Sequence, residues 1–191
     1  MKINRFIILS VTIILMLLLV GCGLDQKIEG SYIQLNKDGS VEATIVELFD
    51  KDYYKVDELV AMTNQEIAAY NGAITLKEYE LDGINMKMVF TFNDVDTYNS
   101  YMPYKLYVGT VQEAYNAGYS IDRILRSTSS KGETIDRDNL LNMASSKVII
   151  VDGAIALKTP TNITYYENSA TLINKTLVNP NGGNEYFIMY K

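Results

Sequence analysis

The fold of this 191-residue chain is decided by its most regular strand pattern, Ile84-Asn-Met-Lys-Met-Val-Phe-Thr-Phe92. Ile84, Met86, Met88, Phe90 and Phe92 alternate with positions that include Asn85, Lys87 and Thr91. Successive side chains of a strand point to opposite faces, so the alternation predicts one buried face and one solvated face. Such a strand belongs in an antiparallel sheet with an apolar layer on one side.

Two Asp-Gly turns extend this pattern into hairpins. Asp82-Gly83 predicts a hairpin over residues 74–92, and Asp38-Gly39 predicts an earlier one over residues 32–49. A helix is expected after each hairpin. Asp50 or Asp52 would cap the first helix, and the second would begin near Asp94 and stop before Pro103.

The two strand-strand-helix units have a common spacing. Their Asp-Gly turns lie 44 residues apart, as do Asp50 and Asp94. This spacing is consistent with an internal duplication, but two ordinary units that share turn and cap residues are the favoured interpretation. Under either interpretation the two helices should lie on one face of an antiparallel sheet.

The remainder of the chain predicts short helices and then strands. Thr110 and Glu113 form a capping box for a helix within residues 109–119, and another helix is expected over residues 136–146. The polar residues 127–134 between them are a possible internal boundary. Short strands are expected at residues 148–151, 154–157, 162–166, 171–178 and 186–190. The predicted fold class is therefore α+β, with a β-rich C-terminal third.

The N-terminal segment has the features of an export signal. Lys2 and Arg5 precede an apolar run of 15 residues, which is shorter than the roughly 20 that a spanning helix needs. The run ends in Leu19-Val20-Gly21-Cys22, which resembles the lipobox of bacterial lipoproteins. An uncleaved membrane anchor is the alternative.

The resemblance implies a processed and lipidated chain. Residues 1–21 would be a removed signal peptide, and Cys22 would carry a diacylglycerol and become the first mature residue. Residues 22–30 would be a tether of at most ~30 Å, and residues 31–191 a single extracytoplasmic domain. The stretch Leu106-Tyr-Val-Gly-Thr-Val-Gln-Glu-Ala-Tyr-Asn-Ala-Gly-Tyr119 is similar to segments of uncharacterised small lipoproteins of Gram-positive anaerobes, a family that implies no activity.

Composition excludes several kinds of chemistry. The chain has no histidine, so histidine-dependent catalysis and histidine metal sites are excluded. Cys22 is the sole cysteine, so disulfides and thiolate zinc sites are excluded as well. Without residues 1–21, 15 basic and 23 acidic residues give a net charge of −8. This charge is unsuited to nucleic acid.

Three Asp-x-Asp pairs are candidate calcium ligands, namely Asp50/Asp52, Asp94/Asp96 and Asp136/Asp138. None has the glycine or the final glutamate of an EF-hand loop. Each pair stands where a helix is expected to start, so helix capping is the favoured interpretation. If any pair binds calcium, Asp94 and Asp96 are the pair to test, because Asn93 and Asn99 lie nearby. No other cofactor is expected.

Tyrosine is the most abundant aromatic residue, with 15 copies. It combines apolar area with a polar tip, so it suits both cores and binding surfaces. Packing is the favoured interpretation. If there is a binding face, the first candidates are Tyr98, Tyr101, Tyr104 and Tyr107, because Pro103 interrupts the helix there.

From these patterns we expect a lipid-anchored extracytoplasmic protein that binds or scaffolds rather than catalyses. Its expected partners are the membrane, through the anchor, and an envelope protein or glycan. One alternative is a small carboxylate-dependent hydrolase of envelope polysaccharide, which would need two carboxylates ~5–9.5 Å apart in a cleft. The other is an accessory subunit of a membrane transport or signalling complex.

Overall fold

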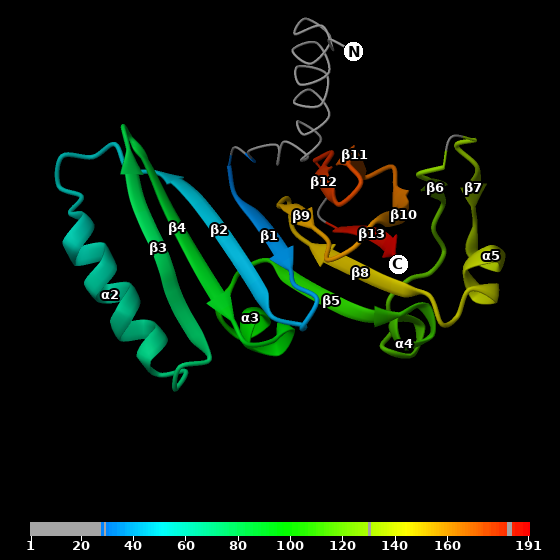
Figure 1. Cartoon of the computed structure of the whole chain (residues 1–191), viewed down its shortest axis with the longest axis horizontal. Coiled ribbons are helices and arrows are strands. Elements are labelled where there is room, and N and C mark those ends of the chain that lie inside the picture. Colours follow the sequence, from blue (N-terminus) through cyan, green and yellow to red (C-terminus); the bar gives the residue numbers. More distant parts are fainter. Residues whose placement is uncertain (1–27, 29, 130, 183–184) are drawn as a thin grey trace, which may run out of the picture.

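The computed structural model describes residues 28, 30–129, 131–182 and 185–191. Within this range the strands form two sheets (Figure 1). The first contains β1 (Tyr32–Leu35), β2 (Val41–Leu48), β3 (Ile74–Asp82), β4 (Asn85–Phe92), β9 (Ala156–Lys158), β11 (Ala170–Asn174) and β12 (Leu177–Pro180). The second contains β5 (Lys105–Thr110), β6 (Leu125–Ser127), β7 (Thr134–Ile135), β8 (Lys147–Asp152), β10 (Ile163–Glu167) and β13 (Glu185–Tyr190).

The first sheet has the strand order β11-β12-β9-β1-β2-β4-β3, and the second has the order β5-β8-β13-β10-β6-β7. The predicted α+β class with a β-rich C-terminal third is confirmed. The strands divide between two sheets, whereas the sequence suggested one. The division follows from pairings between distant segments, such as the parallel pairing of β1 with β9.

Both predicted hairpins are present, and β2 pairs with β4 to join them. Directly paired residues lie on the same face of a sheet. Phe90 and Phe92 therefore share a face with Ala43 and Val41, which we call the core face. The opposite face, which we call the polar face, carries the ion pairs Lys77–Glu42 at 2.7 Å and Lys87–Glu78 at 2.8 Å.

Helices α2 (Val56–Ala68) and α3 (Val95–Tyr101) lie on the core face, as predicted (Figure 1). The ring of Tyr98 on α3 packs edge-on against Phe92, with centroids 5.3 Å apart. Tyr101 on the same helix packs 5.8 Å from Phe90 and 5.7 Å from Tyr70, which follows α2. Aromatic contacts thus fix both helices to the sheet and to each other.

The predicted caps are right for α3 and wrong for α2. The Asp94 carboxylate accepts a hydrogen bond from the Thr97 amide at 2.7 Å, so it caps α3. Helix α2 instead begins after Lys55, whose side chain makes no capping bond, so neither Asp50 nor Asp52 caps it. Two strand-strand-helix units exist, but Asp50 and Asp94 do not have equivalent roles in them.

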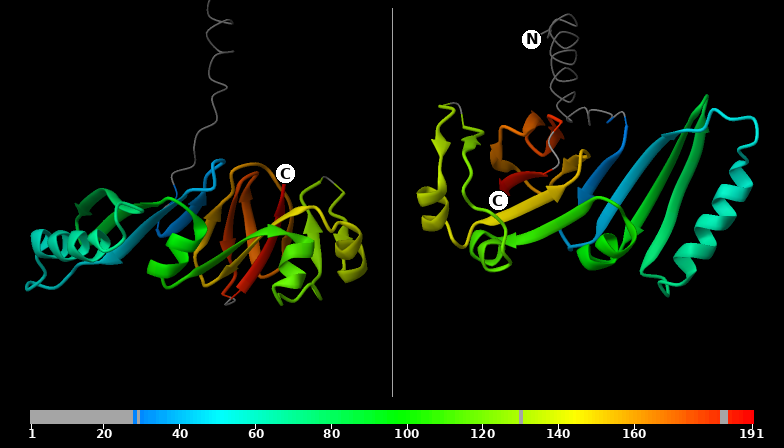
Figure 2. Two further views of the ribbon diagram at one scale, coloured as in Figure 1. Left: turned by 90° about the horizontal axis from the view of Figure 1, so that it is seen from below. Right: turned by 180° about the vertical axis from the view of Figure 1, so that it is seen from behind.

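Helices α4 (Val111–Asn116) and α5 (Arg137–Asn142) cover the outer face of the second sheet (Figure 2). The predicted capping box of Thr110 and Glu113 is confirmed, and Asp136 caps α5 in a second box with Asn139. Side chains of β8 alternate between two apolar clusters. Ile149 and Val151 pack in the main core together with buried side chains of the first sheet. Val148 and Ile150 pack in the second cluster, beneath α4 and α5.

The C-terminal third differs from the prediction at one strand. Residues 171–178 were expected as one strand, but they form parts of the hairpin β11–β12. The side-chain oxygen of Asn174 stabilises the turn between them by accepting a hydrogen bond of 2.9 Å from the Thr176 backbone amide. The possible boundary at residues 127–134 connects β6 and β7, which are neighbours in the second sheet.

Candidate functional site

The four tyrosines proposed from the sequence do not form a common surface. Tyr98 is 0% exposed in the main core, and Tyr101 packs on Phe90. The Tyr104 ring lies against the backbone of Gly153, while Tyr107 packs on Tyr119 in the other cluster with ring centroids 4.6 Å apart. Tyr98, Tyr101 and Tyr104 belong to one apolar cluster and Tyr107 to the other, so the structure does not bring the four together on one face, and a binding role for them stays a prediction.

Two fully buried phenols differ in how their hydroxyls are satisfied. The Tyr186 hydroxyl donates to the carbonyl of Ile155 at 2.7 Å. The Tyr98 hydroxyl is buried and has no partner among the described residues. Burial raises the pKa of both phenols far above the ordinary tyrosine value. Both groups therefore stay neutral, and only Tyr186 gains a hydrogen bond from its hydroxyl.

We expect Tyr186→Phe to lower the free energy of unfolding by about 1–2 kcal/mol, because the buried Ile155 carbonyl loses its donor. Tyr98→Phe should leave stability unchanged or raise it, because the hydroxyl removed is unsatisfied. Urea denaturation of both variants beside the parent chain measures the difference. Equal losses in the two variants would contradict this assignment.

Asp94 and Asp96, the pair proposed for calcium, begin α3. The hydrogen bond from the Thr97 backbone amide lowers the pKa of Asp94, and Asp96 is exposed. The Asn99 side chain bonds the backbone of Leu106 through both its oxygen and its nitrogen. The described residues contain no group of three acidic or cysteine ligands. Calcium at this pair stays a prediction.

A dense charged cluster elsewhere has a structural role. Arg123 forms ion pairs with Glu167, at 2.8 Å, and with Glu185. Its guanidinium also lies 5.5 Å from the centre of the Phe187 ring, and its Nε donates to the Ser120 carbonyl at 2.8 Å. These contacts fasten the segment after α4 to β10 and β13.

Exposed apolar side chains gather at one end of the molecule. Most of the large apolar residues that are substantially exposed lie there, on β2, the loop after it, α2 and the β3–β4 hairpin: Leu48, Tyr53, Tyr54, Met62, Tyr79, Leu81 and Ile84. Tyr53 is 72% exposed, Leu48 is 63% and Met62 is 61%. We call this set the apolar end. Large exposed apolar patches mark interaction sites.

A groove runs through the apolar end between the start of α2 and the core face of the first sheet. Its volume is about 400 Å³. Met86 and Met88 lie on its sheet side, Leu59 and Met62 on its helix side, and Phe49 between them. Methionine side chains are flexible and adapt to different partners, so this lining suits the uptake of an apolar side chain.

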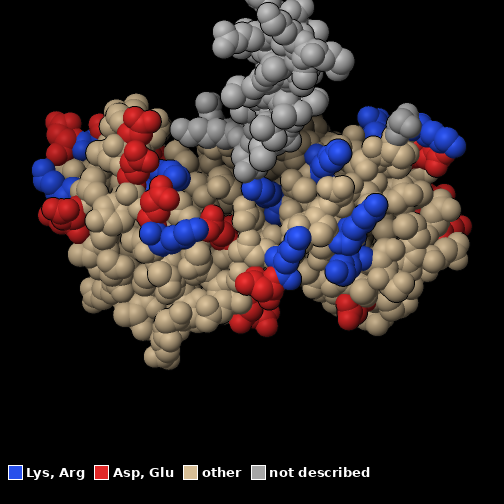
Figure 3. Space-filling model, viewed as in Figure 1, with Lys and Arg blue, Asp and Glu red and all other residues tan. Residues whose placement is uncertain are grey.

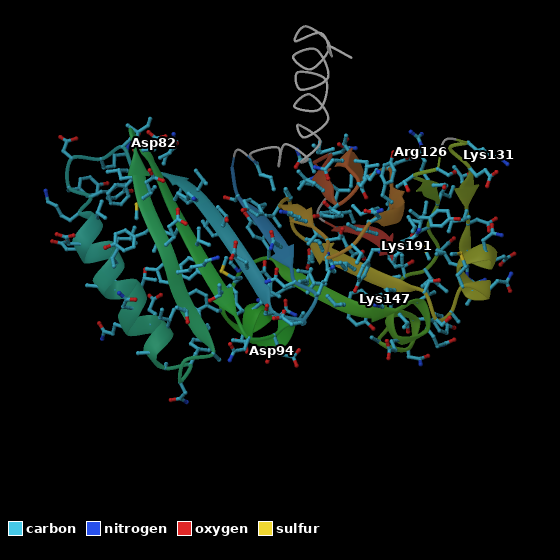
Figure 4. All side chains as sticks on the ribbon, in the orientation of Figure 1. Asp82, Asp94, Arg126, Lys131, Lys147 and Lys191 are labelled. Atoms are coloured by element: carbon cyan, nitrogen blue, oxygen red, sulfur yellow. The ribbon has the colours of Figure 1, made fainter. Side chains whose placement is uncertain are left out.

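Charge is distributed unevenly between the two halves of the domain. Residues 31–104 contain 13 acidic and five basic residues, whereas residues 105–191 contain eight acidic and nine basic. Figure 3 shows acidic side chains clustered around the end that carries the β3–β4 turn, and Figure 4 places Asp82 at its tip. Glu47 and Glu58 line the apolar groove itself. Lys55 lines the groove as well, so two of its three charged lining residues are acidic, and we call this charged margin of the apolar end the acidic rim.

A second concavity, the polar groove, lies on the polar face of the first sheet and crosses several strands from β3 to β12. Its volume is about 580 Å³. Tyr32, Thr44, Asn85, Lys87 and Lys158 are among its lining residues. Glu80 and Asp82 also line it and lie two positions apart on β3, both on this face. A carboxylate hydrolase would need such a pair, and that alternative stays a prediction.

Neither groove was found from the sequence, because each joins residues that are distant along the chain. The apolar end had a weak signal in Tyr53, Tyr54 and Ile84, which are large apolar residues next to turns or in a loop. Cys22 and residues 1–21 lie outside the described residues, as does most of the 22–30 tether. Where the structure describes the chain, no helix is long and apolar enough to cross a bilayer.

Comparison of the chain with protein-family models, with curated proteins and with solved structures finds no match.

Proposed function

We propose that this chain is a lipoprotein on the extracytoplasmic face of the cell membrane, anchored by a diacylglycerol on Cys22, and that its domain binds a protein of the cell envelope. The lipobox Leu19-Val20-Gly21-Cys22 supports the anchor. Two acyl chains give a stable attachment at ~0.8 kcal/mol for each buried CH₂ group. The domain would then act close to the membrane as a binding module without catalysis.

The apolar end is the observation that carries the binding proposal. Exposing Leu48, Tyr53 and Met62 to water has a cost in solvation, and a partner that covers them would remove it. The groove beside them offers Met86 and Met88 to an inserted side chain. Interfaces between proteins have this organisation, with an apolar centre inside a polar rim.

The rim identifies the chemistry of the partner. Glu47 and Glu58 line the groove, and Asp50, Asp52 and Asp57 are close to it in sequence, with only Lys51 and Lys55 to offset them. An acidic rim attracts a cationic segment and repels an anionic one. We therefore assign the apolar end to a basic, apolar segment of an envelope protein. The same rim opposes insertion into an anionic bilayer surface.

Photocrosslinking on intact cells tests this assignment. A photoreactive side chain would replace Tyr53 in one strain and Tyr115 in another. Tyr115 is the control, because it is 49% exposed on α4, outside the apolar end. We expect a discrete adduct at position 53 only, and the crosslinked segment of the partner should be rich in Lys or Arg and in apolar residues. A synthetic peptide of that segment should bind the purified chain more weakly as salt increases.

Met62→Glu is the variant that we expect to weaken binding of the partner at the apolar groove. It places a charge in the groove at a residue that is already 61% exposed, so the fold should tolerate it. The adduct at position 53 should fall at least about tenfold, which corresponds to 1.4 kcal/mol of binding. Equal adducts at positions 53 and 115, or an acidic partner segment, would contradict the proposal.

A further inference from the structure

Basic side chains gather on one side of the C-terminal half of the domain. Figure 3 shows them over this half with few acidic side chains between them. Five of the residues are exposed and Lys158 is half-buried. Within the described residues none of them forms an ion pair. We call this set the basic face: Arg126, Lys131, Lys147, Lys158, Lys175 and Lys191.

The first part of the basic face is built by the pairing of β8 with β13. Lys147 lies opposite Tyr190, and its ammonium group is 5.9 Å from the centre of the Tyr190 ring. Lys191 is the next residue along the chain, and its amide donates to the carbonyl of Asn162 at 3.2 Å. The strand pairing therefore brings Lys147 near Lys191, and Figure 4 shows the two in the same part of the molecule.

The β11–β12 hairpin continues the basic face. The amide of Ile163 on β10 donates to the carbonyl of Lys175 at 2.8 Å, so the turn of the hairpin lies beside β10. Lys158 on β9 is opposite Leu177, which comes two residues after Lys175. Ammonium groups that are brought together without acidic partners repel one another, so the surface is complementary to an anionic one.

The basic face borders the place where the N-terminal segment joins the domain. Ile28 and Gly30 line the polar groove together with Lys158 and Thr176, which follows Lys175. The few residues between Cys22 and this point span at most ~30 Å. An anchor on Cys22 would therefore hold these lysines close to the lipid headgroups.

The two halves of the domain would respond in opposite ways to an anionic membrane. Basic residues slightly outnumber acidic ones in the half that carries the basic face, whereas residues 31–104 contain 13 acidic and five basic residues. Figure 4 places Asp82 and Asp94 in that acidic half. Anionic lipids attract clustered lysines within about one Debye length and repel carboxylates. The membrane would thus draw in the basic face and leave the apolar end accessible to a protein.

We propose that the basic face docks on the anionic headgroups of the membrane to which the chain is anchored. This inference rests on the lipid anchor proposed above and adds an orientation to it. Acyl chains on Cys22 hold the domain near the membrane, but they allow it to turn about the tether. Contact of several lysines with headgroups would restrict that rotation and present the apolar end to its partner.

Lysine acylation of the reconstituted full chain tests the proposal. The lipidated protein is incorporated into vesicles of phosphatidylcholine, or of phosphatidylcholine and phosphatidylglycerol in equal parts, and mass spectrometry measures the rate of modification at each lysine. We expect the anionic vesicles to slow modification of Lys147 and Lys175 at least about threefold, and high salt to restore most of the rate. Lys55, at the apolar end, should react equally in both kinds of vesicle.

Replacing both Lys147 and Lys175 with glutamate should abolish the slowing at Lys158. Both residues are exposed, so the fold should tolerate the change. The matched control replaces Lys51 and Lys55 with glutamate, which reverses as many charges outside the basic face and should leave the slowing at Lys147 intact.

Flotation with phosphatidylcholine vesicles reports the anchor separately. A chain that does not float contradicts the anchor, and this inference with it. A chain that floats but reacts equally in both kinds of vesicle contradicts the docking of the basic face alone, as does equal slowing at Lys55. Slowing by soluble polyphosphate but not by phosphatidylglycerol would overturn the choice of lipid in favour of an anionic polymer.

Discussion

Replacement of Cys22 with alanine should abolish incorporation of an acyl label into the protein and leave residues 1–21 attached to it. The thiol of Cys22 is the only cysteine sulfur in the chain, so no other residue can form the thioether. The loss removes two acyl chains, and a single chain gives only marginal membrane attachment. Metabolic labelling with an alkyne fatty acid, followed by the intact mass of the purified protein, measures both effects.

Gly23→Ala is the control for Cys22→Ala, because it changes the neighbouring residue and keeps the thiol. It should incorporate the label as the parent chain does. A Cys22→Ala protein that remained labelled would contradict the anchor, and so would a parent chain with residues 1–21 still in place. Neither outcome would bear on the two grooves, which depend on the folded domain alone.

Gly153→Ala should have the largest effect on stability. Gly153 follows β8 and has a backbone φ of 140°, a conformation that residues other than glycine rarely adopt. A Cβ there would overlap the Tyr104 ring, whose Cγ would be 3.1 Å away. Backbone strain and overpacking together predict a loss of about 2–5 kcal/mol in the free energy of unfolding. Guanidinium denaturation measures it.

Gly39→Ala separates the two contributions to that loss. Gly39 also has a positive φ, 88°, but nothing lies within 4 Å of the Cβ that alanine would add. Its loss should be limited to about 1–2 kcal/mol of backbone strain. Adding Tyr104→Ala to Gly153→Ala should recover part of the larger loss by removing the overlap. Equal losses at positions 39 and 153 would refute the role of the Tyr104 ring.

Local features of the fold could be predicted because their causes lie within a few residues. The turn at Asp82-Gly83 and the capping box of Thr110 with Glu113 need only neighbouring atoms. The failures have causes that are distant or ambiguous. Asp50 and Asp52 resemble caps, but the helix starts after Lys55. The pairing of β1 with β9 joins residues more than 120 positions apart, and no local pattern encodes it.

The candidate sites depend on such long-range pairing even more strongly. Lys147 and Lys175 share the basic face only because β13 pairs with both β8 and β10, and β10 bonds to the turn of the β11–β12 hairpin. Tyr98 resembles a binding residue in the sequence, yet α3 directs it into the core. The composition excludes histidine-dependent catalysis, since the chain has no histidine. It does not indicate which polar residues face one another in the folded chain.

The position of β13 bears on the export that we propose for this chain. This strand, Glu185–Tyr190, lies in the interior of the second sheet between β8 and β10, and the first sheet takes β9, β11 and β12 from the same third of the chain. Neither sheet can close until synthesis has passed residue 180, and the second also waits for β13. If the chain is exported as we propose, it would have to remain unfolded in the secretion channel, and this topology delays folding until synthesis has passed β13.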